Sequence, residues 1–148
     1  MAVVGGLIPV FVGGGGDDAQ SASAADPGSR ECRGASCEGK SPEGYGCGGD
    51  GKVIREKAEP VRLQIKYSAA CKAAWAKITE ADVGDMVTVS RGAGKTRRGV
   101  IHNDHDQFTP MVAAEGEFAL KACAQANDAK GEPAWEQFCI TASADDIR

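Results

Sequence analysis

The stretch Val61-Arg62-Leu63-Gln64-Ile65-Lys66-Tyr67 alternates apolar and polar residues without interruption. Successive side chains of a β-strand point to opposite faces, so this pattern predicts a strand with one buried face and one face near solvent. Val61, Leu63, Ile65 and Tyr67 should share the buried face. The clearest element of the chain is therefore a β-strand.

A second pair of segments predicts an antiparallel hairpin. Met86 to Arg91 can pair with Thr96 to Asn103 across the glycine-rich turn Gly92-Ala93-Gly94-Lys95, just after the turn at Gly84-Asp85. The segment Ala69 to Ile78 is ambiguous, because its alanines favour a helix whereas Trp75 to Ile78 suit a strand.

The C-terminal part of the chain predicts a hairpin with a defined register. Cys123 and Cys139 are equidistant from Gly131, the middle of the turn-rich segment 127–133. A symmetric hairpin sets them opposite each other, about 4.5–5.5 Å apart and within disulfide reach. In that register one face is apolar and carries Phe118, Leu120, Ala122, Ala124, Phe138 and Ile140. We therefore predict a disulfide Cys123–Cys139 across the two strands.

Composition bounds the fold class and the compartment. The chain has 148 residues with 20 glycines, six prolines and 5% aromatic residues, which indicates a loop-rich β domain with a modest core. The net charge of −4, with both signs mixed, favours neither nucleic acid nor an anionic membrane as a partner. Six cysteines in so short a chain are typical of secreted proteins. We expect an all-β fold, a small disulfide-stapled antiparallel barrel or sandwich, in an extracellular protein.

The other four cysteines, Cys32, Cys37, Cys47 and Cys71, permit three pairings. We favour Cys32–Cys37 with Cys47–Cys71, within an irregular, disulfide-pinned lobe over residues 31–51, and the other pairings stay open. A zinc site needs paired cysteines or histidines at ligand spacing, which Cys32-x4-Cys37 and the distant Cys47 fit poorly. We therefore expect no metal and no cofactor.

The first sixteen residues form an apolar segment, too short to span a bilayer. One interpretation is a signal-peptide remnant with a cleavage site near Ala22-Ser23-Ala24, although no Lys or Arg precedes the apolar run. The other is a docking strand that adds to a partner protein. Its candidate partner-binding residues are Val3, Val4, Gly5, Gly6, Leu7, Ile8, Pro9, Val10, Phe11 and Val12. Residues 17–30 read as a flexible linker, and residues 31–148 as the β domain.

No catalytic site is expected from the sequence. Gly94-Lys95-Thr96 matches the end of a phosphate-binding loop, but Val89 stands where that motif needs a glycine. His102 and His105 lie with Asp104 and Asp106 in a segment that reads as a solvated polar loop. Trp75 and Trp135 are interpreted as packing residues rather than a sugar-stacking platform.

Several segments resemble one family of small secreted proteins. They are Leu63 to Ile78, which contains Tyr-Ser-x-x-Cys-x-x-x-Trp, then Gly84-Asp85 and Thr109 to Val112, with Cys37 to Pro42 and Gly46-Cys47 upstream. Together they resemble the YjfA-like family of Gram-positive bacteria over roughly residues 32–123. That family has no established catalytic residues to transfer. With its apolar N-terminal segment, the chain is similar to one actinobacterial branch, the adaptor subunits of umbrella toxin particles.

The resemblance implies a function. The chain would be a secreted, non-enzymatic adaptor that inserts its N-terminal segment into a cleft of a trypsin-like, lectin-bearing subunit. It would link that subunit to the repeat spokes of a large toxin polypeptide. The alternatives are a secreted protease inhibitor or modulator that uses the same segment, and a cell-wall or carbohydrate-binding module.

Overall fold

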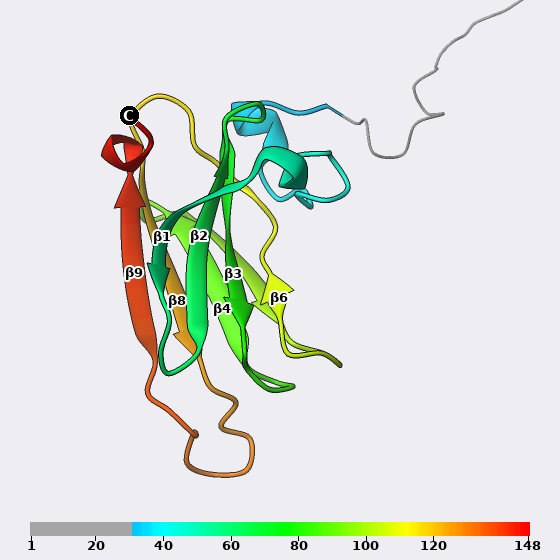
Figure 1. The fold of residues 1–148 in the computed structure, drawn as a ribbon, viewed down its shortest axis with the longest axis vertical. Helices are drawn as coiled ribbons and strands as arrows, with labels where there is room; N and C mark the ends of the chain where they lie inside the picture. The colour runs from blue at the N-terminus through cyan, green and yellow to red at the C-terminus, as the bar shows by residue number, and fades with distance from the viewer. Residues whose placement is uncertain (1–30) are drawn as a thin grey trace, which may run out of the picture.

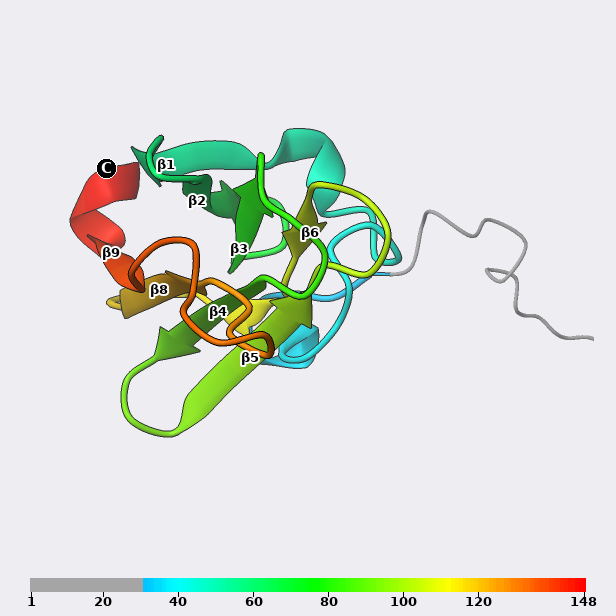
Figure 2. The same ribbon diagram turned by 90° about the horizontal axis from the view of Figure 1, so that it is seen from below.

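The alternating stretch around Ile65 forms β2, which lies inside one of the two antiparallel sheets that residues 31–148 build (Figure 1). The computed structural model describes residues 31–148. The first sheet has the strand order β1-β2-β3-β6, with β7 also paired to β3, and the second has the order β5-β4-β8-β9. The sheets face each other as two layers (Figure 2). The expected all-β, disulfide-stapled fold is thus confirmed and takes the form of a sandwich.

The first sheet comprises β1 (Lys52–Lys57), β2 (Arg62–Ser68), β3 (Ala73–Thr79), β6 (Gln107–Phe108) and β7 (Val112–Ala113). The second sheet comprises β4 (Met86–Arg91), β5 (Lys95–Val100), β8 (Ala119–Gln125) and β9 (Phe138–Ser143). Short 3-10 helices η4 (Gly34–Cys37), η5 (Gly48–Asp50) and η6 (Ala144–Ile147) complete the described part. In that part, no helix has the length and apolar character needed to cross a membrane.

The main core lies between the two sheets. The predicted face of β2 is buried, with Leu63 and Ile65 wholly inaccessible and Val61 and Tyr67 nearly so. Burial of side chains of this size contributes roughly 1.5–3 kcal/mol each. Tyr67 stacks on Phe118, with 6.1 Å between the ring centroids, and so joins the first sheet to the second.

The ambiguous segment 69–78 resolves into a turn followed by β3. Ala74, Ala76 and Ile78 of β3 face the sandwich core, whereas Ala73 and Trp75 belong to a second apolar cluster on the outer face. Thr109, which is fully buried, accepts a hydrogen bond from the Ala76 amide through Oγ1 (3.1 Å) and donates its own amide to the Ala76 carbonyl (2.9 Å). A strand buried on both faces shows no clean alternation, which explains why helix and strand could not be separated.

Both predicted hairpins are present. Strand β4 pairs with β5 in the order Arg91↔Lys95 to Met86↔Val100, so the second strand ends three residues earlier than the predicted Asn103. Beyond the end of β5, Ile101 bonds to the two residues that precede β4: its amide donates to the Asp85 carbonyl (3.0 Å), and its carbonyl accepts from the Gly84 amide (2.8 Å).

The C-terminal hairpin has the predicted register. Cys123 lies opposite Cys139, with a disulfide between them and a Cα–Cα distance of 4.0 Å. The predicted apolar face of the pair packs on the sandwich core. Gly131, at the centre of the connection, has φ +117°, a conformation that side chains rarely adopt.

Three strands were not predicted from the sequence. β1 is almost entirely exposed and contains a register irregularity between Val53 and Arg55, so it lacks apolar alternation. It is held by the ladder to β2 and by an ion pair of 2.6 Å between Arg55 and Asp146 of η6. β6 and β7 are only two residues long each, which is too short for a periodic pattern.

Replacement of Cys123 and Cys139 by alanine should lower the free energy of unfolding by about 2–5 kcal/mol, because the bridge restricts the unfolded chain. Urea denaturation followed by circular dichroism measures the change. The control is the double variant Lys121→Ala/Thr141→Ala, which alters the neighbouring cross-strand pair on the same outer face and should cost about 1 kcal/mol or less. Equal losses in the two double variants would contradict the stapling role, as would a non-reduced peptide map that joins Cys123 to another cysteine.

Candidate functional site

The predicted partner-binding segment, Val3 to Val12, lies outside the described residues, as does the linker 17–30. The structure describes the chain from Glu31, one residue before the first disulfide-bonded cysteine.

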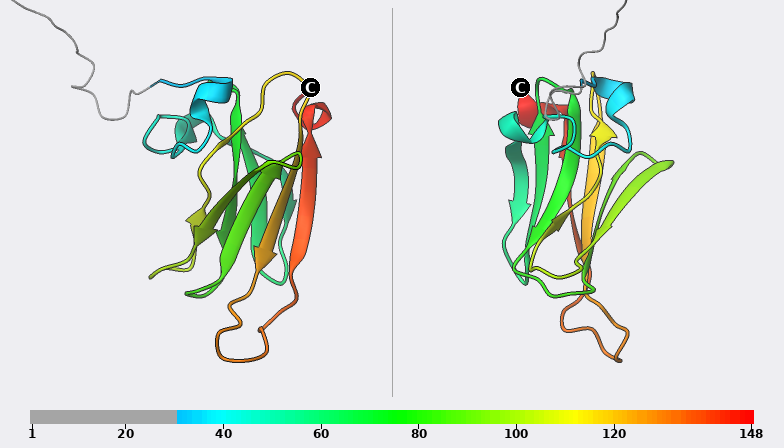
Figure 3. Two further views of the ribbon diagram at one scale, coloured as in Figure 1. Left: turned by 180° about the vertical axis from the view of Figure 1, so that it is seen from behind. Right: turned by 90° about the vertical axis from the view of Figure 1, so that its right-hand side faces the viewer.

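The N-terminal lobe, residues 31–51, is irregular as predicted and contains η4 and η5. It lies at the end of the sandwich opposite the β8–β9 connection (Figure 3). Its cysteines pair as favoured from the sequence, Cys32 with Cys37 and Cys47 with Cys71. The second of these bridges fastens the lobe to the turn between β2 and β3.

Backbone hydrogen bonds fix the lobe independently of the disulfides. The Gly39 amide donates to the Met111 carbonyl and the Met111 amide donates to the Lys40 carbonyl, both at 2.8 Å. Glu38 adds a bond from each carboxylate oxygen: Oε1 accepts from the Ala113 amide (3.0 Å) and Oε2 accepts from Arg97 Nε (3.0 Å). The lobe is thus joined to β7 and β5 as well as to the β2–β3 turn.

Asp50 forms a further link between the lobe and the β2–β3 turn. Ser68 Oγ donates to one carboxylate oxygen of Asp50 (2.6 Å) and the Ala70 amide donates to the other (3.1 Å). Burial raises the pKa of the Asp50 carboxyl, but these hydrogen bonds outweigh it and hold the pKa below its ordinary value. Ser68 Oγ also accepts from the Cys71 amide (3.1 Å), so the network supports the turn at the Cys47–Cys71 bridge.

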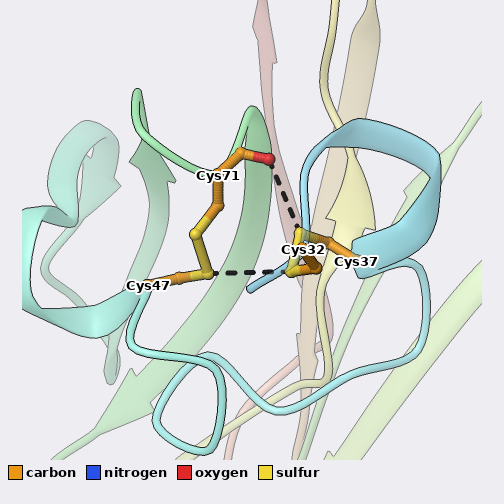
Figure 4. Close-up of side chains that lie close together, drawn as sticks. All are labelled: Cys32, Cys37, Cys47 and Cys71. Atoms are coloured by element: carbon orange, nitrogen blue, oxygen red, sulfur yellow. Dashed lines mark hydrogen bonds between the residues drawn. A yellow bond between two sulfur atoms is a disulfide. The ribbon is translucent and has the colours of Figure 1, made fainter. Parts of the chain in front are cut away.

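The four lobe-associated sulfur atoms form a single cluster (Figure 4). They all lie within 4.8 Å of one another, although the cysteines span residues 32–71. The distance between Cys32 Sγ and Cys47 Sγ, which belong to different disulfides, is 3.9 Å. The Cys71 carbonyl oxygen lies 3.5 Å from Cys37 Sγ. Cys37 and Cys47 are wholly inaccessible, and Met111, Ala73 and Trp75 pack around the cluster.

A hollow of about 720 Å³ opens beside this cluster, between the lobe and the loop that leads to β6. Its lining includes Pro42 and Glu43 of the lobe, Lys66, Trp75 and Lys77 of the sheet, and His102, Asp104, Asp106 and Phe108. Cationic and anionic side chains both line it, so the hollow does not select strongly for one sign of charge. The hollow was not predicted from the sequence. A local signal for it is the pair Lys66 and Trp75, which lie opposite each other at outward positions of β2 and β3.

The two histidines do not act together at the hollow. His102 lines it, whereas His105 Nδ1 lies 2.8 Å from the Ala81 carbonyl oxygen, and both residues are exposed as a solvated loop predicts. Within residues 31–148, the cysteine quartet is the one group of three or more potential metal ligands gathered at ligand distance. Lys95 and Thr96 of the phosphate-loop-like motif are exposed at the start of β5, in a hairpin rather than before a helix.

The packing of Trp75 against Gly51 gives a direct test of how the lobe packs on β3. A Cβ atom added at Gly51 would lie 2.8 Å from two atoms of the Trp75 ring, whereas one added at Gly49 meets nothing within 4 Å. Gly51→Ala should therefore lower the free energy of unfolding by about 1–3 kcal/mol through overpacking. Gly49→Ala, the matched control, should change it by about 0.5 kcal/mol or less in the same chemical denaturation. Equal effects of the two substitutions would contradict this packing.

Comparison with known proteins identifies a family for this domain. No curated protein matches the chain, and no solved structure matches it. A family described as "Protein of unknown function (DUF2690)" matches residues 35–123, which run from η4 into β8 and include Cys37, Cys47 and Cys71. Because the match covers more than half of the sequence, the chain belongs to the DUF2690 family.

Proposed function

We propose that the chain is a secreted, non-enzymatic adaptor of a toxin particle. Val3 to Val12 inserts into a cleft of a secreted trypsin-like, lectin-bearing subunit, and the sandwich contacts the repeat spokes of a large toxin polypeptide. The proposal rests on the resemblance to umbrella-toxin adaptors and on the contrast between the apolar N-terminal segment and the domain that follows it.

That contrast is the observation that carries the proposal. Among the large apolar side chains of residues 31–148, the exposed ones are Val53, Val83 and Ile147, and these belong to β1, the loop before β4 and η6. Scattered apolar residues of this kind are normal on a protein surface. The described domain thus offers little apolar surface to a partner, and the apolar run Val3–Val12 is the stronger candidate for a buried contact.

Energetics favour docking by such a segment. Each large side chain of the run contributes on the order of 1.5–3 kcal/mol when fully buried in a groove, while ordering a flexible segment costs several kcal/mol. A tether over Gly13 to Arg30 then holds the sandwich near a second partner at high effective concentration. Because Cys32 is disulfide-bonded, the tether joins the domain at a cross-linked point.

Secretion is supported by the use of cysteine. All six cysteines are paired in disulfides, which form and persist in oxidising compartments. The same pairing supports a non-enzymatic role, because it leaves no thiol nucleophile. In the described part of the chain His105 is engaged with the Ala81 carbonyl, and His102 stands on an exposed loop.

The hollow gives little support to a carbohydrate-binding module. Sugar sites commonly present the face of an aromatic ring to the ligand, but Trp75 at the hollow is 3% exposed and packs in the second cluster. Trp135 packs against Phe138, with 5.7 Å between the ring centroids, and against the sandwich core. The described tryptophans thus serve packing, as the sequence analysis expected.

Deletion of Met1 to Gly16 should abolish assembly with the trypsin-like subunit while leaving the melting temperature of the domain nearly unchanged. Pull-down from culture supernatant with mass spectrometry measures assembly, and calorimetry measures stability. A chain in which residues 17–30 are replaced by a Gly/Ser linker of equal length is the matched control and should assemble as the parent does.

Three results would contradict this proposal. A truncated chain that assembles at full affinity would rule out the docking segment. Inhibition of the partner's proteolysis by the parent chain, without recruitment of a repeat protein, would favour the inhibitor alternative. Retention of the truncated chain on purified cell-wall polysaccharide, without protein partners, would favour a carbohydrate-binding module.

A further inference from the structure

The geometry of the sulfur cluster points to a second state of the lobe: when its two disulfides are reduced, Cys32, Cys37, Cys47 and Cys71 bind one Zn²⁺ ion as a tetrathiolate site. This inference is independent of the adaptor proposal. It concerns the same four cysteines that, in the oxidised protein, form the pairs Cys32–Cys37 and Cys47–Cys71.

The distances between the two disulfides are close to those of a zinc site. A tetrahedral site with Zn–S bonds of about 2.3 Å separates its sulfur atoms by about 3.8 Å. Cys32 Sγ and Cys47 Sγ lie 3.9 Å apart, and no two of the four sulfurs are more than 4.8 Å apart. Within each former disulfide the sulfurs need to separate by less than about 2 Å to reach that spacing. Rotation of the side chains can supply this movement.

The spacing of the four cysteines in the sequence does not indicate this arrangement. Cys32-x4-Cys37 with Cys47 does not resemble paired zinc ligands, but the β2–β3 turn brings Cys71 to the same point and completes a set of four. Cys32, Cys37 and Cys47 thus reach the cluster from the lobe, and Cys71 reaches it from the β2–β3 turn (Figure 4).

The surroundings fit a structural zinc site rather than a catalytic one. Structural sites are closed, with four protein ligands, whereas catalytic sites keep an open position. Cys37 and Cys47 are wholly inaccessible and Cys71 is 7% exposed. Met111 and Trp75 pack in the same cluster, and Cys32 is the one partly buried member of the quartet.

The lobe also has contacts that persist when the disulfides open. The Gly39–Met111 and Met111–Lys40 backbone hydrogen bonds and the Asp50–Ser68 bond do not involve sulfur. They hold the two sides of the cluster together, so the four thiols stay close after reduction. Bound zinc would then replace the lost cross-links.

Conversion of the two disulfides into the zinc site needs a reductant, which can be a dithiol or a phosphine. Each disulfide takes up two electrons and two protons to give two thiols, and the reductant is oxidised correspondingly. Binding of Zn²⁺ displaces the four thiol protons as four Zn–S bonds form. Oxidation of the zinc form by a disulfide-class oxidant removes four electrons, restores the two S–S bonds and releases Zn²⁺. The chain would thus keep a folded lobe on both sides of a change in redox compartment.

The test uses the full chain, reduced by a phosphine without oxygen and titrated with Zn²⁺ against a chromogenic chelator. Co²⁺ serves as a spectroscopic probe, because tetrahedral tetrathiolate cobalt has characteristic visible bands. We expect about one equivalent of tightly bound metal in the reduced chain and none in the oxidised chain. Cys32→Ser/Cys37→Ser and Cys47→Ser/Cys71→Ser should each weaken binding at least about a hundredfold.

Two matched controls separate this site from others. Cys123→Ser/Cys139→Ser removes the third disulfide and should leave metal binding as in the reduced parent, as should His102→Ala/His105→Ala. If the reduced chain loses structure, recovery of its circular dichroism on addition of zinc supports the site. The inference is overturned if the reduced parent binds no zinc, if it binds no more tightly than the lobe variants, or if a control variant abolishes binding.

Discussion

Burial of β3 on both of its faces is the constraint on which the rest of the structure depends. Ala74, Ala76 and Ile78 pack into the sandwich, while Ala73 and Trp75 pack under the lobe. The strand therefore needs an apolar cover on its outer side, and the irregular segment 31–51 supplies it. Because that segment has no sheet ladder of its own, it is held in place by disulfides, by backbone hydrogen bonds to Met111 and by the Asp50 network.

This arrangement determines where functional surfaces can form. The lobe meets the sheet beside the sulfur cluster, and the hollow opens where the lobe, the outer face of β2 and β3, and the loop before β6 come together. The described surface has few exposed large apolar side chains, and for this reason the proposed adaptor function assigns the apolar partner contact to Val3–Val12.

Much of the fold follows from local sequence patterns, but the site does not. Alternation identified β2, and symmetry about Gly131 gave the register and pairing of Cys123 and Cys139. β1, β6 and β7 were not predicted, because an exposed edge strand and two-residue strands show no periodic pattern of apolar residues. The hollow and the sulfur cluster depend on contacts between segments distant in sequence, such as Cys32 with Cys47 and Cys71, and no local spacing encodes them.

The most direct test of the central role of β3 is amide hydrogen exchange of the variant Trp75→Ala. If β3 couples the two apolar clusters, loss of the Trp75 ring should lower the hydrogen-exchange protection of the Gly39 amide in the lobe. It should also lower protection in β4 of the opposite sheet, because both regions should open together with β3, which lies between them. The exposed substitution Val83→Ala should leave both regions as in the parent. Loss of protection confined to the lobe, with β4 unchanged, would contradict the account.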